Sequence, residues 1–174
     1  SFSIPDYLDP GHYSCDLAMY SSLGDVYRIP LVFRVPFPVM DVRFPDDIIL
    51  YKVRPPYIES ESFMIVKETV GYTPLVDVNI SAEITECPGN NKCDKYKDAV
   101  TLISSLDFID RGKSAKIKIP IKFRFSDPRG DYRWQIRVDA SNDNRSASYN
   151  TWTVELLPPT CRNAEMQIRY VDRE

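Results

Sequence analysis

The chain offers few residues for acid–base or nucleophilic chemistry. His12 is its only histidine, and general acid–base work near neutral pH most often uses that residue. There is no Gly-x-Ser-x-Gly elbow that would supply a nucleophile. Asp46-Asp47, and Glu59 with Glu61, lie in polar, turn-like stretches, where solvated loop charges are a simpler interpretation than paired glycosidase carboxylates. We therefore expect no catalytic residue.

Oxygen-bearing side chains cluster in one place, at Asp139, Asn142, Asp143 and Asn144. Such a cluster could bind calcium, but Asn and Asp are also the ordinary residues of polar hairpin loops. No phosphate-binding loop, dinucleotide fingerprint or EF-hand occurs. The sequence thus predicts neither a metal site nor a cofactor.

The four cysteines, Cys15, Cys87, Cys93 and Cys161, indicate the redox compartment. Cys87 and Cys93 bracket a turn-rich loop that a small disulfide could close, which would leave Cys15 and Cys161 to join the two ends of the chain. Free structural thiols and a zinc site are the alternatives, although Cys-x5-Cys with one distant histidine is a poor spacing for zinc ligands. We predict the pairs Cys87–Cys93 and Cys15–Cys161.

Two glycosylation sequons, at Asn79 and Asn144, agree with a secretory context, so glycan attachment is expected. No apolar run is long enough to span a membrane, and Ser1 follows no leader-like segment. We expect a secreted protein or the extracellular or luminal face of a membrane. With 22 Lys+Arg against 25 Asp+Glu, the net charge of −3 excludes the strong basic field of a non-specific nucleic-acid binder.

Alternating apolar and polar residues are the clearest structural signal. Residues 115–125 alternate Ala, Ile and Phe with Lys and Arg, which predicts a half-buried antiparallel strand. Pro120 places that strand at a sheet edge or a bulge. Further strands are expected at 13–19, 26–37, 48–53, 63–68, 75–85, 132–140 and 149–156. Residues 94–110 are ambiguous, because their apolar residues fall at the spacing of an amphipathic helix, while residues 100–103 fit a short buried strand equally well.

An internal sequence similarity, here called the echo, is relevant to the domain organisation. Residues 28–35 resemble residues 118–125, which suggests either a tandem β unit with a shortened first copy or a single elaborated sandwich. We divide the chain into a β-rich segment, 1–61, and a sandwich, 62–174.

One segment resembles a known family. In Gly130-x-Tyr132-x-Trp134, the spacing is that of the tyrosine corner of immunoglobulin-like domains, with Trp134 in the place of the core cysteine. The residues that follow also resemble the fibronectin type III pattern. The resemblance covers roughly residues 62–158 and implies an all-β, antiparallel immunoglobulin-like β-sandwich with at most one short helix, of an adhesive or receptor-like kind.

The same turn contains Arg129-Gly130-Asp131, a triplet that integrins recognise on protruding loops of adhesive ligands. The turn and the following strand also account for these residues. The first expectation is therefore a non-catalytic module for protein–protein recognition or adhesion. An integrin-binding ligand is the second, and a carbohydrate-binding or accessory domain of an extracellular hydrolase is the third.

Overall fold

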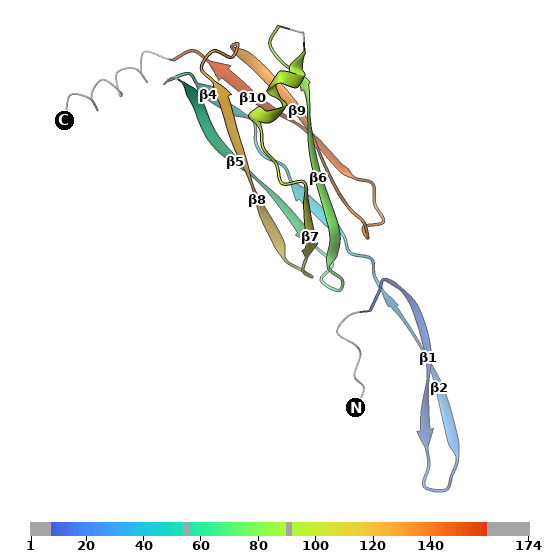
Figure 1. Cartoon of the computed structure of the whole chain (residues 1–174). Helices are drawn as coiled ribbons and strands as arrows, with labels where there is room; N and C mark the ends of the chain where they lie inside the picture. Colours follow the sequence, from blue (N-terminus) through green and yellow to red (C-terminus); the bar gives the residue numbers. More distant parts are fainter. Residues whose placement is uncertain (1–7, 54–55, 90–91, 160–174) are drawn as a thin grey trace, which may run out of the picture.

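The computed structural model describes residues 8–53, 56–89 and 92–159 and shows an all-β protein (Figure 1). Within these ranges no helix is long and apolar enough to cross a membrane. The elements are β1 (Gly11–Tyr20), β2 (Val26–Val35), β3 (Met40–Arg43), β4 (Ile48–Tyr51), β5 (Tyr57–Glu68), β6 (Leu75–Glu86), the 3-10 helix η1 (Cys93–Ala99), β7 (Ser105–Ile109), β8 (Ser114–Arg124), β9 (Gly130–Ala140) and β10 (Ser148–Leu157).

The strands form a two-sheet sandwich and a separate hairpin. One sheet of the sandwich has the order β4-β10-β9-β6-β7, and the facing sheet has the order β3-β5-β8. All of the ladders are antiparallel except that between β4 and β10. Strands β1 and β2 pair only with each other and project from one end of the sandwich (Figure 1). The predicted all-β sandwich is confirmed.

The core lies between the two sheets, and period-two alternation selects its residues. On β8, Ile117, Ile119, Ile121 and Phe123 are buried while the intervening basic residues face solvent. β8 is an edge strand of its sheet, as Pro120 predicts.

Strand β9 contributes the largest buried side chains. Tyr132, Trp134, Ile136 and Val138 are all at most 1% exposed. The rings of Trp134 and Trp152 lie 5.9 Å apart between centroids, and Trp134 also contacts Phe123 across the sandwich. The expected core position of Trp134 is therefore confirmed.

The structure changes two of the sequence-based boundaries. In residues 94–110 neither alternative holds as predicted: the 3-10 helix η1 ends at Ala99, residues 100–103 contribute only an isolated bridge at Val100, and β7 begins at Ser105. The boundary between 61 and 62 falls inside β5, and the sandwich already includes β3 and β4. The echo of residues 28–35 and 118–125 relates β2 of the hairpin to β8, an edge strand of the sandwich, and the choice between a tandem β unit and a single elaborated sandwich stays a prediction.

Candidate interaction surface

The β1–β2 hairpin has one wholly apolar side. Because directly paired residues of two strands point to the same face, the pairs Tyr13↔Phe33, Cys15↔Leu31, Leu17↔Ile29 and Met19↔Tyr27 share one side. We call this the apolar face. It consists of four side chains of β1 and five of β2: Tyr13, Cys15, Leu17, Met19, Tyr27, Ile29, Leu31, Phe33 and Val35.

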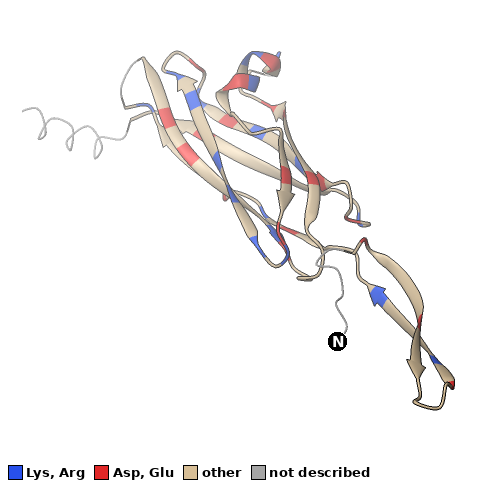
Figure 2. Ribbon diagram, turned by 60° about the horizontal axis from the view of Figure 1, so that its bottom comes forward, with Lys and Arg blue, Asp and Glu red and all other residues tan. Residues whose placement is uncertain are grey.

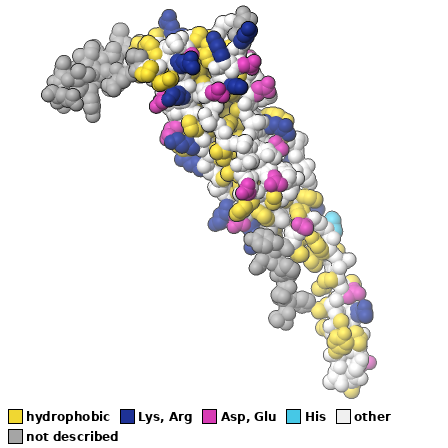
Figure 3. Space-filling view, in the orientation of Figure 1, with side chains coloured by type: hydrophobic (Ala, Val, Ile, Leu, Met, Phe, Trp, Pro, Cys, Tyr) yellow, Lys and Arg dark blue, Asp and Glu magenta, His cyan; other side chains and the backbone are white. Residues whose placement is uncertain are grey.

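The apolar face is uncovered in this structure. Met19, Tyr27, Ile29, Leu31 and Phe33 each expose 36–59% of their surface. Figure 3 shows hydrophobic side chains gathered along the projecting hairpin. A single two-stranded hairpin is marginally stable in water unless a further layer packs on it, and the described residues supply no such layer.

The opposite face of the hairpin carries all the charged side chains of the two strands, interspersed with apolar ones such as Tyr20, Val26 and Val32, which are 50–76% exposed. It carries His12, Asp16, Arg28 and Arg34 together with Ser14, and Arg28 lies 3.8 Å from Asp16. His12 is exposed and pairs with Arg34 across the ladder. The hairpin is therefore amphipathic, like a strand pair at the surface of a larger fold.

A short proline-containing linker, residues 36–39, joins the hairpin to the sandwich and is held at both ends. The carbonyl oxygen of Pro36 accepts a hydrogen bond of 2.9 Å from the hydroxyl of Thr73, which is buried. The amide of Met40 donates to the carboxylate of Asp143 at 2.9 Å. The linker is thus anchored to the end of the sandwich rather than freely hinged.

Two residues of the candidate calcium cluster, Asn142 and Asp143, hold backbone at this end of the sandwich, and only Asp143 bonds the end of the linker. Asn142 accepts a hydrogen bond from the Val76 amide at 2.9 Å, and the Asp143 carboxylate accepts bonds from the amides of Met40 and Arg145. Burial alone would raise the pKa of Asp143, but these amides and the Arg145 guanidinium outweigh it and lower the pKa. No group of three or more acidic, His or Cys side chains in the described ranges could hold a metal ion.

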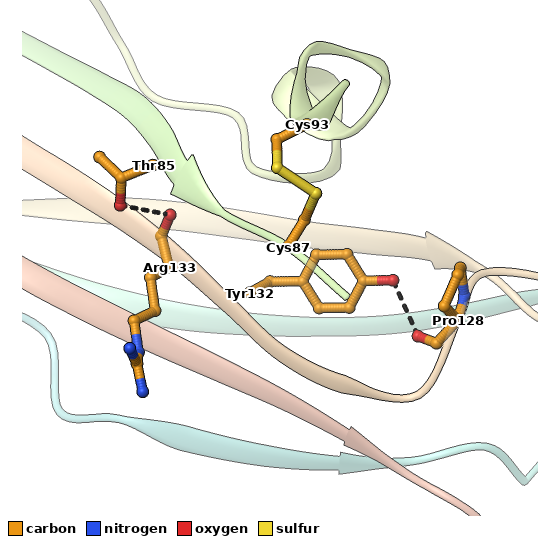
Figure 4. The surroundings of a disulfide bond; sticks show 6 residues. All are labelled: Thr85, Cys87, Cys93, Pro128, Tyr132 and Arg133. Atoms are coloured by element: carbon orange, nitrogen blue, oxygen red, sulfur yellow. Dashed lines mark hydrogen bonds between the residues drawn. A yellow bond between two sulfur atoms is a disulfide. The ribbon is translucent and has the colours of Figure 1, made fainter. Parts of the chain in front are cut away.

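The tyrosine corner and the small disulfide lie together at the other end of the sandwich (Figure 4). The Tyr132 hydroxyl donates to the carbonyl oxygen of Pro128 at 2.8 Å. Burial first, and then Tyr96, raise the pKa of this hydroxyl, which therefore stays a donor. Cys87 and Cys93 form the predicted disulfide beside it. The corner thus fixes the entry into β9.

The Arg129-Gly130-Asp131 triplet lies where the chain enters β9, not at the tip of a loop. Asp131 is paired with Glu155 in the ladder, and its carboxylate lies 3.4 Å from the Arg133 guanidinium. Gly130 has φ +125°, and a Cβ there would come within 3.1 Å of Pro88. Arg129 and Asp131 are exposed, but the backbone between them is held against the sheet. This geometry does not present the triplet on a protruding loop.

The second predicted disulfide, Cys15–Cys161, lies partly outside the described residues. Cys15 is an exposed free thiol on the apolar face, and Cys161 lies outside the described residues, so the Cys15–Cys161 pair stays a prediction.

The two sequons are accessible. Asn79 lies on β6 with an exposed side chain, and Asn144 lies in the exposed loop between β9 and β10. Both positions allow attachment of a glycan, which stays a prediction.

The outer face of the β5–β8 pair carries opposite charges, which Figure 2 shows along the two strands. Lys118 pairs with Glu61, and Lys122 lies 2.7 Å from Glu59. A shallow depression of about 390 Å³ lies beside Tyr57 and Tyr96, but the ammonium group of Lys122 covers the Tyr57 ring at 4.2 Å and Tyr96 is buried. The depression therefore offers no open aromatic platform for a sugar.

Comparisons with known proteins assign neither a family nor an activity. No family model and no curated protein matches the chain. Two solved structures resemble it with a TM-score of 0.49. A family 123 glycoside hydrolase from Clostridium perfringens has 17% identity over 59% of this chain and 21% of its own. The ASH/PapD-like domain of human CEP192 has 14% identity over 74% of this chain and 92% of its own.

Sequence reasoning did not find the apolar face as a site. It identified the alternation of Tyr13, Cys15, Leu17 and Met19, and it treated residues 26–37 as one more strand of the fold. The available signal was that β2 alternates in the matching phase while the chain between Val35 and Met40 contains two prolines. What the pattern did not reveal is that the sandwich closes without this hairpin.

Proposed function

We propose that this chain is a non-catalytic β-sandwich module for protein–protein recognition or adhesion, and that its binding element is the β1–β2 hairpin. The observation that carries the proposal is the apolar face, which packs against no other described element. Exposed apolar patches of this extent mark protein interaction sites in soluble proteins. The immunoglobulin-like class is supported by the Tyr132 corner.

A secreted or extracellular location is part of the same proposal. The Cys87–Cys93 disulfide supports it, since such bonds persist in oxidising compartments. The two accessible sequons are consistent with it. To test the location, protein from its natural source is treated with an endoglycosidase, and we expect the peptides that contain Asn79 or Asn144 to lose the mass of a glycan. Unglycosylated asparagines together with reduced cysteines would contradict the location.

The binding role is tested by hydrogen exchange of the hairpin amides in protein from its natural source and in the recombinant 174-residue chain. We expect slow exchange in the native material and fast exchange in the isolated chain, because only the former contains the partner. Hairpin amides that exchange equally fast in both would refute the proposal.

Two substitutions on one strand provide a matched pair. Leu31→Asp puts a charge on the apolar face, and Val32→Asp puts one on the opposite face, where the side chain is already 76% exposed. We expect only Leu31→Asp to remove the native protection. Equal effects of the two would show that the face itself is not the contact.

A further inference from the structure

The β1–β2 hairpin repeats the register of the β9–β10 hairpin inside the sandwich. In the first, Gly11 pairs with Val35 and Tyr13 with Phe33. In the second, Gly130 pairs with Leu156 and Tyr132 with Val154. The tyrosine follows the glycine by two residues in both, and the two pairs occupy the same steps of the ladder. The two hairpins therefore have the same spacing of glycine and tyrosine and the same pairing register.

The tyrosine corner is also repeated. The Tyr13 hydroxyl donates to the carbonyl oxygen of Asp9 at 2.6 Å, four residues upstream. The Tyr132 hydroxyl donates to Pro128 at 2.8 Å, also four residues upstream. This bond is typical of the strand that enters the closing hairpin of an immunoglobulin-like sandwich. Cys15 occupies the position two residues after the tyrosine, where such domains carry their core cysteine.

The two hairpins differ in what covers them. Every member of the set Tyr132, Trp134, Ile136, Val138, Trp152, Val154 and Leu156 is buried to 1% exposure or less. The corresponding side chains of the apolar face are exposed, since Leu31 and Phe33 keep 36% and 38% of their surface. The first hairpin has the inner face of a sandwich and lacks the facing sheet.

We propose that β1 and β2 are the last two strands of a second immunoglobulin-like sandwich, and that its facing sheet comes from polypeptide upstream of Ser1 and is bonded to Cys15. This inference goes beyond the proposed function, because the layer that covers the apolar face then belongs to the same polypeptide and not to a separate protein. The direction follows from chain order, because β9 and β10 are the last strands of the sandwich described here. Strands that complete an equivalent unit around β1 and β2 therefore precede them.

A second copy of the hairpin is a poorer occupant. The corner bond of Tyr13 is typical of a strand inside a sandwich, and the pairing of two hairpins would not account for it. The anchored linker of residues 36–39 also fits two consecutive sandwiches in a fixed relation, since the Pro36 carbonyl and the Met40 amide are both bonded to the second one.

The bond to Cys15 is an ordinary thiol oxidation. The Sγ atom of Cys15 and that of a cysteine in the facing sheet form one S–S bond and release two protons. The two electrons reduce a disulfide of an oxidoreductase in the secretory pathway to its dithiol. No part of the 174-residue chain has to move for this step, because the Cys15 thiol is already on the apolar face.

The test is non-reducing peptide mapping of the native polypeptide together with exchange of its hairpin amides. We expect the Cys15 peptide to be linked to a peptide from upstream of Ser1, with the hairpin protected. A native protein that begins at Ser1, a free Cys15, or a bond from Cys15 to Cys161 or to a second Cys15 overturns this inference.

The two proposals fail in different ways. Protected hairpin amides with Cys15 bonded elsewhere would leave the binding role intact and remove the second sandwich. Unprotected amides in the native polypeptide would remove both. As a matched control, Cys93→Ser in the native polypeptide should leave the Cys15 linkage unchanged, because the Cys87–Cys93 bond belongs to the other sandwich.

Discussion

The two tyrosine-corner hairpins of this chain show how little of a strand's burial its own sequence sets. β9 and β10 lie in the middle of a sheet and face β8 and β5, so their apolar side chains are inaccessible. β1 and β2 have the same pairing, the same corner bond and the same alternation, but they face solvent. The local pattern builds the hairpin, and the facing layer turns its apolar side into a core.

The largest contrast is expected at the position two residues after each tyrosine. Trp134→Ala should cost about 3–5 kcal/mol of unfolding free energy because it empties a large buried site. In the recombinant chain, Cys15→Ala at the equivalent position should change stability by less than about 0.5 kcal/mol. Urea unfolding followed by circular dichroism measures both. A comparable loss for Cys15→Ala would show that the hairpin already has a core of its own.

The disulfide beside the second corner should give the next largest effect. Replacing Cys87 and Cys93 by Ser opens a loop of six-residue separation, which is worth about 2 kcal/mol in the chain-entropy account. Thermal unfolding measures the loss, with Cys15→Ser as the control that should leave the midpoint unchanged. An unaltered midpoint in the double variant would mean that η1 and its loop do not contribute to the cooperative unit.

Removing the corner hydroxyls sharpens the comparison. Tyr132→Phe should lose about 1 kcal/mol, because the buried ring keeps its packing but the bond to Pro128 is gone. Tyr13→Phe should have a smaller effect in the recombinant chain, where the hairpin is not tied to the sandwich core. Denaturant midpoints measure both losses. A larger loss for Tyr13→Phe than for Tyr132→Phe would contradict the comparison of the two hairpins.

The smallest expected effect concerns pH and the linker. The pKa of Asp143 is lowered in the folded protein, mainly by hydrogen bonds from Met40 and Arg145 that overcome its burial. The corresponding stability is present above the ordinary aspartate pKa of about 4 and disappears as pH falls through the lowered folded value. Asp143→Asn should therefore flatten the loss of stability on acidification. Equal acid sensitivity in both proteins, measured by thermal melts between neutral and acidic pH, would exclude this role.

Much of the fold was predictable because the relevant interactions are local. Residues 115–125 and 132–140 alternate so regularly that strand, inward face and the buried position of Trp134 followed directly. Cys87 and Cys93 are close enough in sequence for the turn between them to favour their disulfide. By contrast, residues 94–110 stayed ambiguous, because a 3-10 turn and a short strand there succeed one another.

The candidate site was less accessible to sequence reasoning. Asp139, Asn142, Asp143 and Asn144 have the composition of a cation site, and only the backbone amides of Met40 and Val76 show that two of them hold backbone at one end of the sandwich. Similarly, the Arg129-Gly130-Asp131 triplet lies on a strand entry because of a ladder with β10.

By itself, the sequence determined that this is an all-β chain of amphipathic strands, with an aromatic core on β9 and a small disulfide loop, because alternation and short-range spacing depend on neighbouring residues alone. Tertiary structure decided which amphipathic strands share a core. The side chains of β1 and β2 are as apolar as those of β9 and β10 on one face, but burial requires a second layer at about 10 Å. In the sandwich that layer is made of residues far away in the sequence, and among the described residues no such layer covers the first hairpin.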